Sequence, residues 1–195
     1  MANPRRLIVG ISGASGILYG QRLLELLRET DVETHLIISR AGDLTRAHEL
    51  DIPSVKLREL AHVCYPIQDV GAAISSGSFR TMGMVIIPCS VKTLAEIATG
   101  ISSNLLTRAA DVVLKERRRL VLAVRESPLN LIHLRNMVTV TEAGGIIAPP
   151  LPAFYTTPSS IDEMVTQTAA RLLDFFDIEV PALKRWGEKE AHPED

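Results

Sequence analysis

The sequence predicts a three-layer α/β protein with a doubly wound parallel sheet, and three observations lead to this prediction. Short apolar runs alternate along the chain with longer amphipathic segments. Each short run is almost continuously apolar, which is typical of strands that helices cover on both faces. The chain has 195 residues, of which 46% are hydrophobic, so it has the size and composition of one domain. We expect that domain over residues 1–186 and a polar C-terminal tail over residues 187–195.

Five apolar runs are expected to form the strands. The first is rich in β-branched residues and ends at glycines, as a buried strand before a tight turn does. Pro88 is expected to end the third strand, because proline lacks the N–H group that a sheet ladder needs. The expected strands are Arg6–Ile11, Thr34–Ser39, Met84–Pro88, Arg119–Val124 and Gly145–Ala148.

Five segments with helical character are expected to cover this sheet. In the first of them, Leu23, Leu24 and Leu27 fall on one side of the helix. Ser160 is suited to cap the last one, because its hydroxyl can accept a hydrogen bond from a first-turn amide. The expected helices are Tyr19–Arg28, Leu94–Thr99, Leu105–Glu116, Leu129–Glu142 and Ser160–Phe176.

Charge and cysteine content disfavour several classes of function. The net charge is −2, whereas sequence-independent binding of nucleic acid needs a basic excess. Cys64 and Cys89 cannot build a disulfide framework or, alone, a zinc site. The first apolar run, Leu7–Ile11, is too short for a signal peptide or a membrane span. We therefore expect a cytoplasmic protein that binds neither nucleic acid nor membrane.

The mean hydropathy of the chain is high, at +0.16. Apolar surface in excess of what one core can bury is commonly hidden between subunits. We therefore expect a homo-oligomer, the alternative being an unusually large core.

The turn after the first strand is rich in glycine. A doubly wound sheet binds its ligands at the carboxyl ends of its strands, and here Gly10, Gly13 and Gly16 precede a helix. Glycines let a ligand approach the backbone, and a helix N-terminus offers amide donors to an anion; a plain tight turn is the alternative. The spacing differs from the dinucleotide fingerprint. Ser39 also stands where a nicotinamide enzyme places an acidic residue, which disfavours NAD.

Two further strand ends carry polar side chains. Ser90 opens a helix together with Lys92 and Thr93, and its hydroxyl is either an N-cap alone or part of a second anion-binding turn. Arg125 and Glu126 follow the fourth strand. They could clamp a phosphate and carry a proton, or simply form a surface ion pair. Hydroxyl-rich loops and an arginine at one sheet edge predict a site for a phosphorylated mononucleotide.

Other polar and aromatic side chains leave more than one interpretation open. Arg108 and Lys115 share a helical face and could grip a second anion across a subunit contact, or merely complement the helix end. Tyr155 and Trp186 belong to the few aromatic residues; filling the core is their default role, and walling a pocket is the alternative. Neither metal-ligand spacing nor a G-x-S-x-G nucleophile turn occurs, so a metal-independent protein is expected.

Six segments of the chain resemble the UbiX-type flavin prenyltransferases. They are Gly10–Gly16, Ser75–Ser78, Pro88–Thr93, Arg108–Arg117, Val124–Leu129 and Pro149–Tyr155. The resemblance extends from about residue 6 to Trp186. Some members of this family carry the older name aromatic acid decarboxylase, because a separate decarboxylase requires them.

The resemblance implies a flavodoxin-like, Rossmann-like fold and an enzyme that joins a dimethylallyl unit from dimethylallyl phosphate to reduced FMN, without a metal. The product, prenylated FMN, would serve a partner UbiD-type decarboxylase. Family members form large symmetric homo-oligomers, commonly dodecamers. The residues that the resemblance assigns to FMN are Gly13, Ala14, Ser15, Ser39, Ser90, Val91, Lys92, Thr93 and Arg125.

The resemblance also assigns residues to the prenyl donor. Tyr155 and Arg171 would bind its phosphate, helped by Arg108 and Lys115 from a neighbouring subunit. Trp186 would cover the prenyl pocket. An allylic phosphate ionises only if the leaving anion is stabilised, and fixed cations can do this without a metal.

Proton transfer is assigned to three further positions by the same resemblance. Ser15 with Glu49 would manage protons at the flavin, and Glu126 would assist departure of the phosphate. The stretch around Glu49 matches the family pattern least closely.

Two other functions stay open. Flavin-dependent decarboxylases of cysteine-conjugated acids share the glycine turn, but they need a P-x-M-N-x-x-M-W segment that this sequence lacks. A non-catalytic FMN-binding accessory subunit of an aromatic acid decarboxylase would have no use for a second phosphate site. The residues that disfavour that function are Arg108, Lys115, Glu126, Tyr155 and Arg171.

Overall fold

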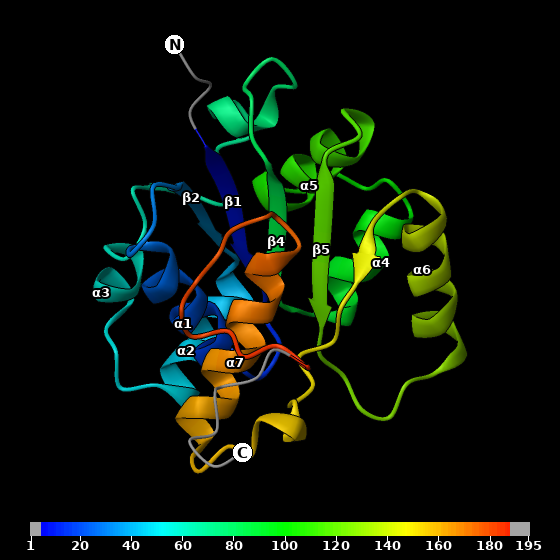
Figure 1. The fold of residues 1–195 in the computed structure, drawn as a ribbon. Coiled ribbons are helices and arrows are strands. Elements are labelled where there is room, and N and C mark those ends of the chain that lie inside the picture. Colours follow the sequence, from blue (N-terminus) through cyan, green and yellow to red (C-terminus); the bar gives the residue numbers. More distant parts are fainter. Residues whose placement is uncertain (1–4, 188–195) are drawn as a thin grey trace.

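Six parallel strands form the centre of the molecule (Figure 1). The computed structural model describes residues 5–187, and its strand order is β3-β2-β1-β4-β5-β6. The chain moves outward from β1 to β3 and then crosses to β4 on the other side of β1, so the switch point of the sheet lies between β1 and β4. The strands are β1 Arg6–Ile11, β2 Glu33–Ile38, β3 Val63–Tyr65, β4 Gly83–Cys89, β5 Arg119–Val124 and β6 Ile146–Ile147. The predicted doubly wound parallel sheet is confirmed.

Seven α-helices surround this sheet in the described part of the chain. They are α1 Ile17–Leu27, α2 Arg40–Glu49, α3 Ser54–Arg58, α4 Val91–Ala98, α5 Leu105–Lys115, α6 Leu131–Glu142 and α7 Ile161–Asp174. Two 3-10 turns lie at Ala73–Ser75 and Phe154–Thr156. Ser90 and Ser160 cap α4 and α7 by accepting hydrogen bonds from the amides of Thr93 and Glu163, as the sequence predicts.

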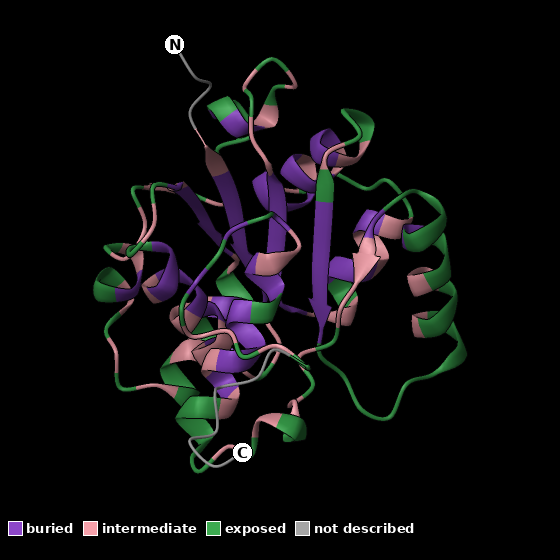
Figure 2. Cartoon of the chain, viewed as in Figure 1, coloured by how far each residue is buried: buried purple, intermediate pink, exposed green. Residues whose placement is uncertain are grey.

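The two faces of the sheet carry separate cores. Side chains alternate along β1, so Val9 faces the helices α1 and α7, whereas Ile8 faces α4 and α5. Figure 2 shows the central strands buried along most of their length. This arrangement places α5 and α7 on opposite faces of the sheet, which matters for the candidate site.

Some expectations about local structure are wrong. The strand β4 does not end at Pro88; it continues to Cys89, which pairs with Val124 beyond a register irregularity. An irregularity of this kind accommodates a residue without an N–H group. Ser39 lies outside β2 and caps α2.

The elements β3, α2 and α3 are absent from the sequence prediction. β3 has only three residues, all partly buried, so its apolar run is too short to indicate a strand. α2 buries only Gly42, so it lacks the apolar stripe that reveals a helix. The omission of β3 and α2 matters because these two elements border the site described below.

Residues 188–195 of the predicted tail lie outside the described residues. Within residues 5–187, every helix is too short or too polar to cross a bilayer.

Candidate functional site

A cavity of about 400 Å³ lies at the carboxyl edge of the sheet. The loops that follow β1, β2, β3 and β4 all contribute to its wall, as expected near the switch point of a doubly wound sheet. Five residues that the family resemblance assigns to FMN line it: Gly13, Ser39, Ser90, Lys92 and Thr93. Its other lining residues are Arg40, Ala41, Leu44, Ile67, Gln68, Glu96, Asn104 and Leu106.

A buried serine joins two of these loops. The Ser12 hydroxyl donates to the carbonyl of Pro88 at 3.0 Å and accepts from the amide of Ser90 at 2.8 Å. Ser12 is 1% exposed, so these hydrogen bonds are shielded from water and fix the turn after β1 against the turn after β4. Sequence reasoning missed Ser12, because one serine among glycines carries no signal of its own.

The glycines of the first turn have structural reasons of their own. A Cβ atom at Gly13 would lie 2.4 Å from the Cβ of Ala41, so only glycine lets α2 approach this turn. Gly16 has a φ of 98°, in the left-handed region that favours glycine. The tight-turn interpretation therefore accounts for these two positions, while Gly13 also lines the cavity.

The N-terminus of α1 is capped by a carboxylate from another helix. Glu49, the last residue of α2, accepts hydrogen bonds from the amides of Gly16 at 2.8 Å and Ile17 at 3.0 Å. The expectation that these amides are open to a ligand anion is thus wrong for Gly16 and Ile17, because Glu49 already occupies them. Negative charge at a helix N-terminus is favourable, so the contact stabilises α1 and ties the end of α2 to it.

Glu49 titrates below its ordinary range. Partial burial acts to raise the pKa of the carboxyl, but hydrogen bonds from Ser15, Ile17 and Gly16 and the charge of Arg125 outweigh it and lower the pKa. Glu49 is therefore ionised at neutral pH. Ser15 and Glu49, which the family resemblance pairs, are in contact through this hydrogen bond.

The first turn of α4 presents donors to the cavity. The Ser90 hydroxyl accepts from the amide of Thr93 at 3.3 Å and donates to its hydroxyl at 3.1 Å, so it does cap the helix. The amides of Val91 and Lys92 precede the helix's own hydrogen-bond ladder. The Lys92 ammonium is 78% exposed and lies 3.2 Å from Glu96. Backbone donors and a cation in one turn suit a phosphate group, so the capping and anion-binding interpretations of Ser90 are compatible.

The charge of Arg125 acts on residues of the first two helices rather than on its sequence neighbour. Its amide donates to the carbonyl of Cys89 at 3.0 Å, and its charge acts on Tyr19 and Glu49. Burial raises the pKa of Tyr19, against the opposing effect of Arg125. Glu126 accepts from the amide of Ser127 at 3.0 Å, and among the described residues no ion pair joins Arg125 to Glu126. The surface ion pair considered from the sequence is absent.

A second cluster lies outside the cavity, where the C-terminal segment meets α7. The rings of Tyr155 and Trp186 pack edge to face with centroids 5.5 Å apart. Tyr155 is 45% and Trp186 81% exposed, so the default expectation that they fill the core is wrong. Arg171 donates to Asp174 at 3.0 Å and stacks on the ring of Phe175.

Comparison with known proteins identifies the family to which this chain belongs. A protein-family model described as Flavoprotein matches residues 1–173. The flavin prenyltransferase UbiX of Escherichia coli (strain K12) is 55% identical over 185 residues, which cover 93% of this chain and 98% of that protein. The chain belongs to the UbiX-type flavin prenyltransferase family. The resemblance stated from the motifs is confirmed, and so is the flavodoxin-like fold.

Solved structures of UbiX-type proteins match this chain over nearly its whole length. The crystal structure of AnUbiX (PadA1) in complex with FMN and dimethylallyl pyrophosphate has a TM-score of 0.94 and 47% identity, covering 96% of this chain and 100% of that chain. A dodecameric FMN-dependent UbiX-like decarboxylase from Escherichia coli O157:H7 has a TM-score of 0.91 and 48% identity, covering 93% of this chain and 98% of that chain.

Two cations that the UbiX-type pattern assigns to the donor phosphate lie elsewhere in the subunit. Arg108 pairs with Asp111 at 2.7 Å, and Lys115 pairs with Glu116 at 2.5 Å. Both belong to α5, on the opposite face of the sheet from α7, which carries Arg171. A single subunit therefore does not bring all three cations together.

The cavity contains residues that the UbiX-type motifs did not single out. Arg40 follows Ser39 directly, and Gln68 comes soon after the short strand β3. Arg40 was within reach of sequence reasoning, because it stands one position beyond a strand end already considered. Gln68 was not, because β3 was not predicted. The described residues contain no group of three His, Cys, Asp or Glu side chains placed to hold a metal ion.

Proposed function

We propose that this chain joins the dimethylallyl unit of dimethylallyl phosphate to reduced FMN and releases prenylated FMN. The observation that carries the proposal is its close match, at a TM-score of 0.94, to a protein whose crystal structure holds FMN and dimethylallyl pyrophosphate. The cavity at the carboxyl edge of the sheet supports it, since its hydroxyls, amides and cations suit a mononucleotide phosphate.

FMN is held by the turns at this edge of the sheet. The residues proposed for it are Gly13, Ala14, Ser15, Ser39, Ser90, Val91, Lys92, Thr93 and Arg125. Lys92 and the first amides of α4 bind the phosphate, whereas Arg125, whose charge acts on Tyr19 and Glu49, lies beside the ring system. When bound, reduced flavin supplies the electrons for the new bonds.

The leaving phosphate is stabilised by cations from two subunits. As the allylic C–O bond breaks, its electron pair passes to the phosphate, and the negative charge is met by Arg171 and the Tyr155 hydroxyl. Arg108 and Lys115 of a neighbouring subunit complete the group, because their own subunit holds them on the other face. Glu126 carries the proton that assists departure of the phosphate.

Two further pairs of residues exclude water from the reacting groups and move protons at the flavin. The aromatic pair Tyr155 and Trp186 covers the prenyl group and keeps water from the developing cation. Ser15 and Glu49 share a hydrogen bond, and the ionised carboxylate accepts the proton that the flavin loses.

The exposed apolar side chains of α6 support assembly into a homo-oligomer. The exposed fractions of Leu131, Ile132, Leu134 and Val138 on α6 lie between 45% and 66%, and Val140 is its one buried residue (Figure 2). An exposed apolar helix face of this kind marks a protein contact. A relative of 48% identity is dodecameric, and we propose the same assembly for this chain.

A UbiD-type decarboxylase receives the product, because a modified flavin cofactor that is released needs an enzyme to use it. The reaction belongs in the cytoplasm, in keeping with the free thiols of Cys64 and Cys89.

Mass spectrometry of the flavin tests the proposal. The pure protein is incubated without oxygen with reduced FMN and dimethylallyl phosphate, and the flavin is then released. A flavin heavier by one prenyl unit is expected, and dimethylallyl diphosphate in a parallel reaction defines the donor. FMN that is bound but unmodified with both donors would refute the proposal and favour the accessory subunit.

A further inference from the structure

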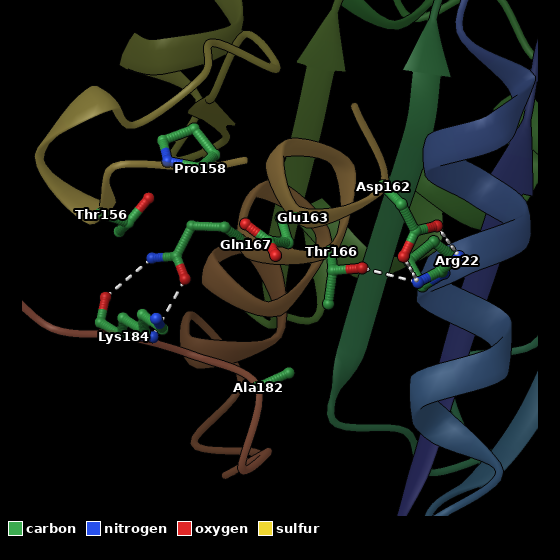
Figure 3. A pocket seen from close by; sticks show the side chains of 9 residues that line it. All are labelled: Arg22, Thr156, Pro158, Asp162, Glu163, Thr166, Gln167, Ala182 and Lys184. Atoms are coloured by element: carbon green, nitrogen blue, oxygen red, sulfur yellow. Dashed lines mark hydrogen bonds and ion pairs between the residues drawn. The ribbon is translucent and has the colours of Figure 1, made fainter. Parts of the chain in front are cut away.

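Gln167 of α7 joins three segments that lie far apart in the sequence. Its side-chain amide donates to the carbonyl of Lys184 at 2.7 Å, and its side-chain oxygen accepts from the amide of Lys184 at 2.9 Å. The same amide nitrogen lies 3.4 Å from the Tyr155 hydroxyl. Figure 3 shows the Gln167 side chain reaching across to the backbone of Lys184.

The Gln167 side of these contacts is buried, whereas Lys184 lies at the surface. Gln167 is 5% exposed, and it borders a cavity of about 320 Å³ between α7, α1 and the C-terminal segment (Figure 3). The segment around Lys184 has no regular secondary structure, so its peptide groups need partners from elsewhere. Gln167 hydrogen-bonds both the C=O and the N–H of Lys184, as a neighbouring β-strand would.

The carbonyl of Lys184 receives two donors. Besides Gln167, the Tyr155 hydroxyl donates to it at 3.2 Å. A tyrosine has a single hydroxyl proton, so Tyr155 can donate to a phosphate only by giving up this carbonyl. Because Gln167 still donates to the carbonyl of Lys184, that acceptor keeps a hydrogen bond when Tyr155 changes partner.

The same helix face carries the other parts of the second cluster. Arg171 and Asp174 follow Gln167 by four and seven positions, so the three share one face of α7. Asp174 accepts from both Arg171 and Arg185. Trp186, which packs on Tyr155, therefore directly follows Lys184 and Arg185. Gln167 and Asp174 of α7 hold these two residues by side-chain hydrogen bonds.

We propose that Gln167 is a positioning residue, which holds the segment carrying Trp186 in place and frees the Tyr155 hydroxyl for the phosphate of the prenyl donor. This inference rests on the proposed prenyl transfer for its second half only. The first half concerns the chain alone and can be tested without turnover.

Gln167→Met is the main variant, because it keeps the volume of the side chain and removes its hydrogen bonds. Trp186 is the single tryptophan, so tryptophan fluorescence anisotropy of the flavin-free protein reports on its segment directly. We expect the anisotropy to fall. We also expect KM for dimethylallyl phosphate to rise about tenfold, kcat to change by less than about threefold, and the Kd of FMN to stay within about twofold.

Gln21→Met is the matched control, since Gln21 makes a hydrogen bond to Glu25 on the surface of α1 and should leave all four quantities unchanged. Gln167→Glu is the second variant, and it carries the test if Gln167→Met does not fold. A protonated carboxyl can still donate to the Lys184 carbonyl and a carboxylate cannot, so its KM should return toward the wild-type value as the pH is lowered.

Wild-type anisotropy and wild-type KM in Gln167→Met would overturn the proposal. Equal losses of FMN and donor binding would overturn it as well, because they would show general damage to the fold. If the wild-type protein makes no prenylated flavin, the proposed function fails, and the anisotropy still decides whether Gln167 holds the segment.

Discussion

The carboxylate of Glu49 accepts a hydrogen bond from the amide of Gly16 at 2.8 Å, although 33 positions separate the two residues. Through this contact the end of α2 caps the start of α1. The left-handed Gly16 has no side chain with which to cap its own helix, so Glu49 supplies the missing acceptor.

Gln in place of Glu49 should destabilise the protein by about 0.5–1 kcal/mol at neutral pH, because the charge at the helix N-terminus is lost. The pKa of Glu49 is lower in the folded protein than its ordinary value. Its contribution is therefore complete above that ordinary value and disappears as the pH falls through the folded-state pKa. Thermal unfolding of both proteins over this pH range measures the effect. Glu29→Gln, at an exposed position just beyond the end of α1, is the control. A difference in stability that persisted in acid would contradict the assignment.

Lys92→Ala should weaken FMN binding about fivefold, which corresponds to about 1 kcal/mol, because a cation beside the proposed phosphate site is removed. Lys56→Ala is a matched control: Lys56 pairs with Glu59 as Lys92 pairs with Glu96, but it lies on α3, outside the cavity. Quenching of flavin fluorescence measures both affinities. The difference between the variants should shrink at high salt; equal affinities at low salt would remove Lys92 from the site.

Tyr155→Phe and Arg171→Ala should raise KM for the prenyl donor at least about tenfold while FMN stays bound. Neither residue lines the cavity proposed for FMN, so the two ligands should respond separately. Steady-state kinetics and FMN titration measure this, with Arg28→Ala as a control on the exposed C-terminal end of α1. Loss of FMN from both variants would show that the two sites are not separate.

Mixed oligomers of Arg108→Ala and Tyr155→Phe should be more active, at a low concentration of the prenyl donor, than either variant alone. Arg108 and Arg171 lie on opposite faces of one subunit, and Arg171 and Tyr155 are proposed to bind the same phosphate. A complete site therefore needs Arg108 from one chain and Tyr155 from another. Random mixing of equal amounts then restores about a quarter of the sites. The measurement is the rate after co-refolding of the two variants. Activity no higher than the mean of the parents would place Arg108 outside the shared site.

Glu126→Gln should slow turnover by about a hundredfold and leave the affinities for both ligands within about twofold, as expected for a residue that only carries a proton. Glu126 is exposed and accepts from the amide of Ser127, so its replacement should not disturb the fold. Single-turnover kinetics measure the step, and Glu142→Gln at the exposed end of α6 serves as control. An unchanged rate would exclude Glu126 from the mechanism.

Local patterns predicted most of the sheet and its helices. The strands β1 and β5 are continuous apolar runs and begin and end where the sequence places them. β3 and α2 were not predicted because β3 is a three-residue edge strand and α2 buries only Gly42, so it has no apolar stripe. The cavity was predicted at the correct edge of the sheet, but its lining residue Gln68 was missed because it follows a strand that was not predicted.

The sequence by itself determined the features that depend on neighbouring residues or on the order of motifs. The helix caps Ser90 and Ser160, the alternation of strands and helices, and the UbiX-type motifs are of this kind, because a cap or an apolar run needs partners only a few positions away. Tertiary structure alone decided that Glu49 caps α1, that Gln167 joins Tyr155 to Lys184, and that α5 and α7 lie on opposite faces. These relationships depend on how the crossovers place distant segments beside one another, and no local pattern encodes that placement.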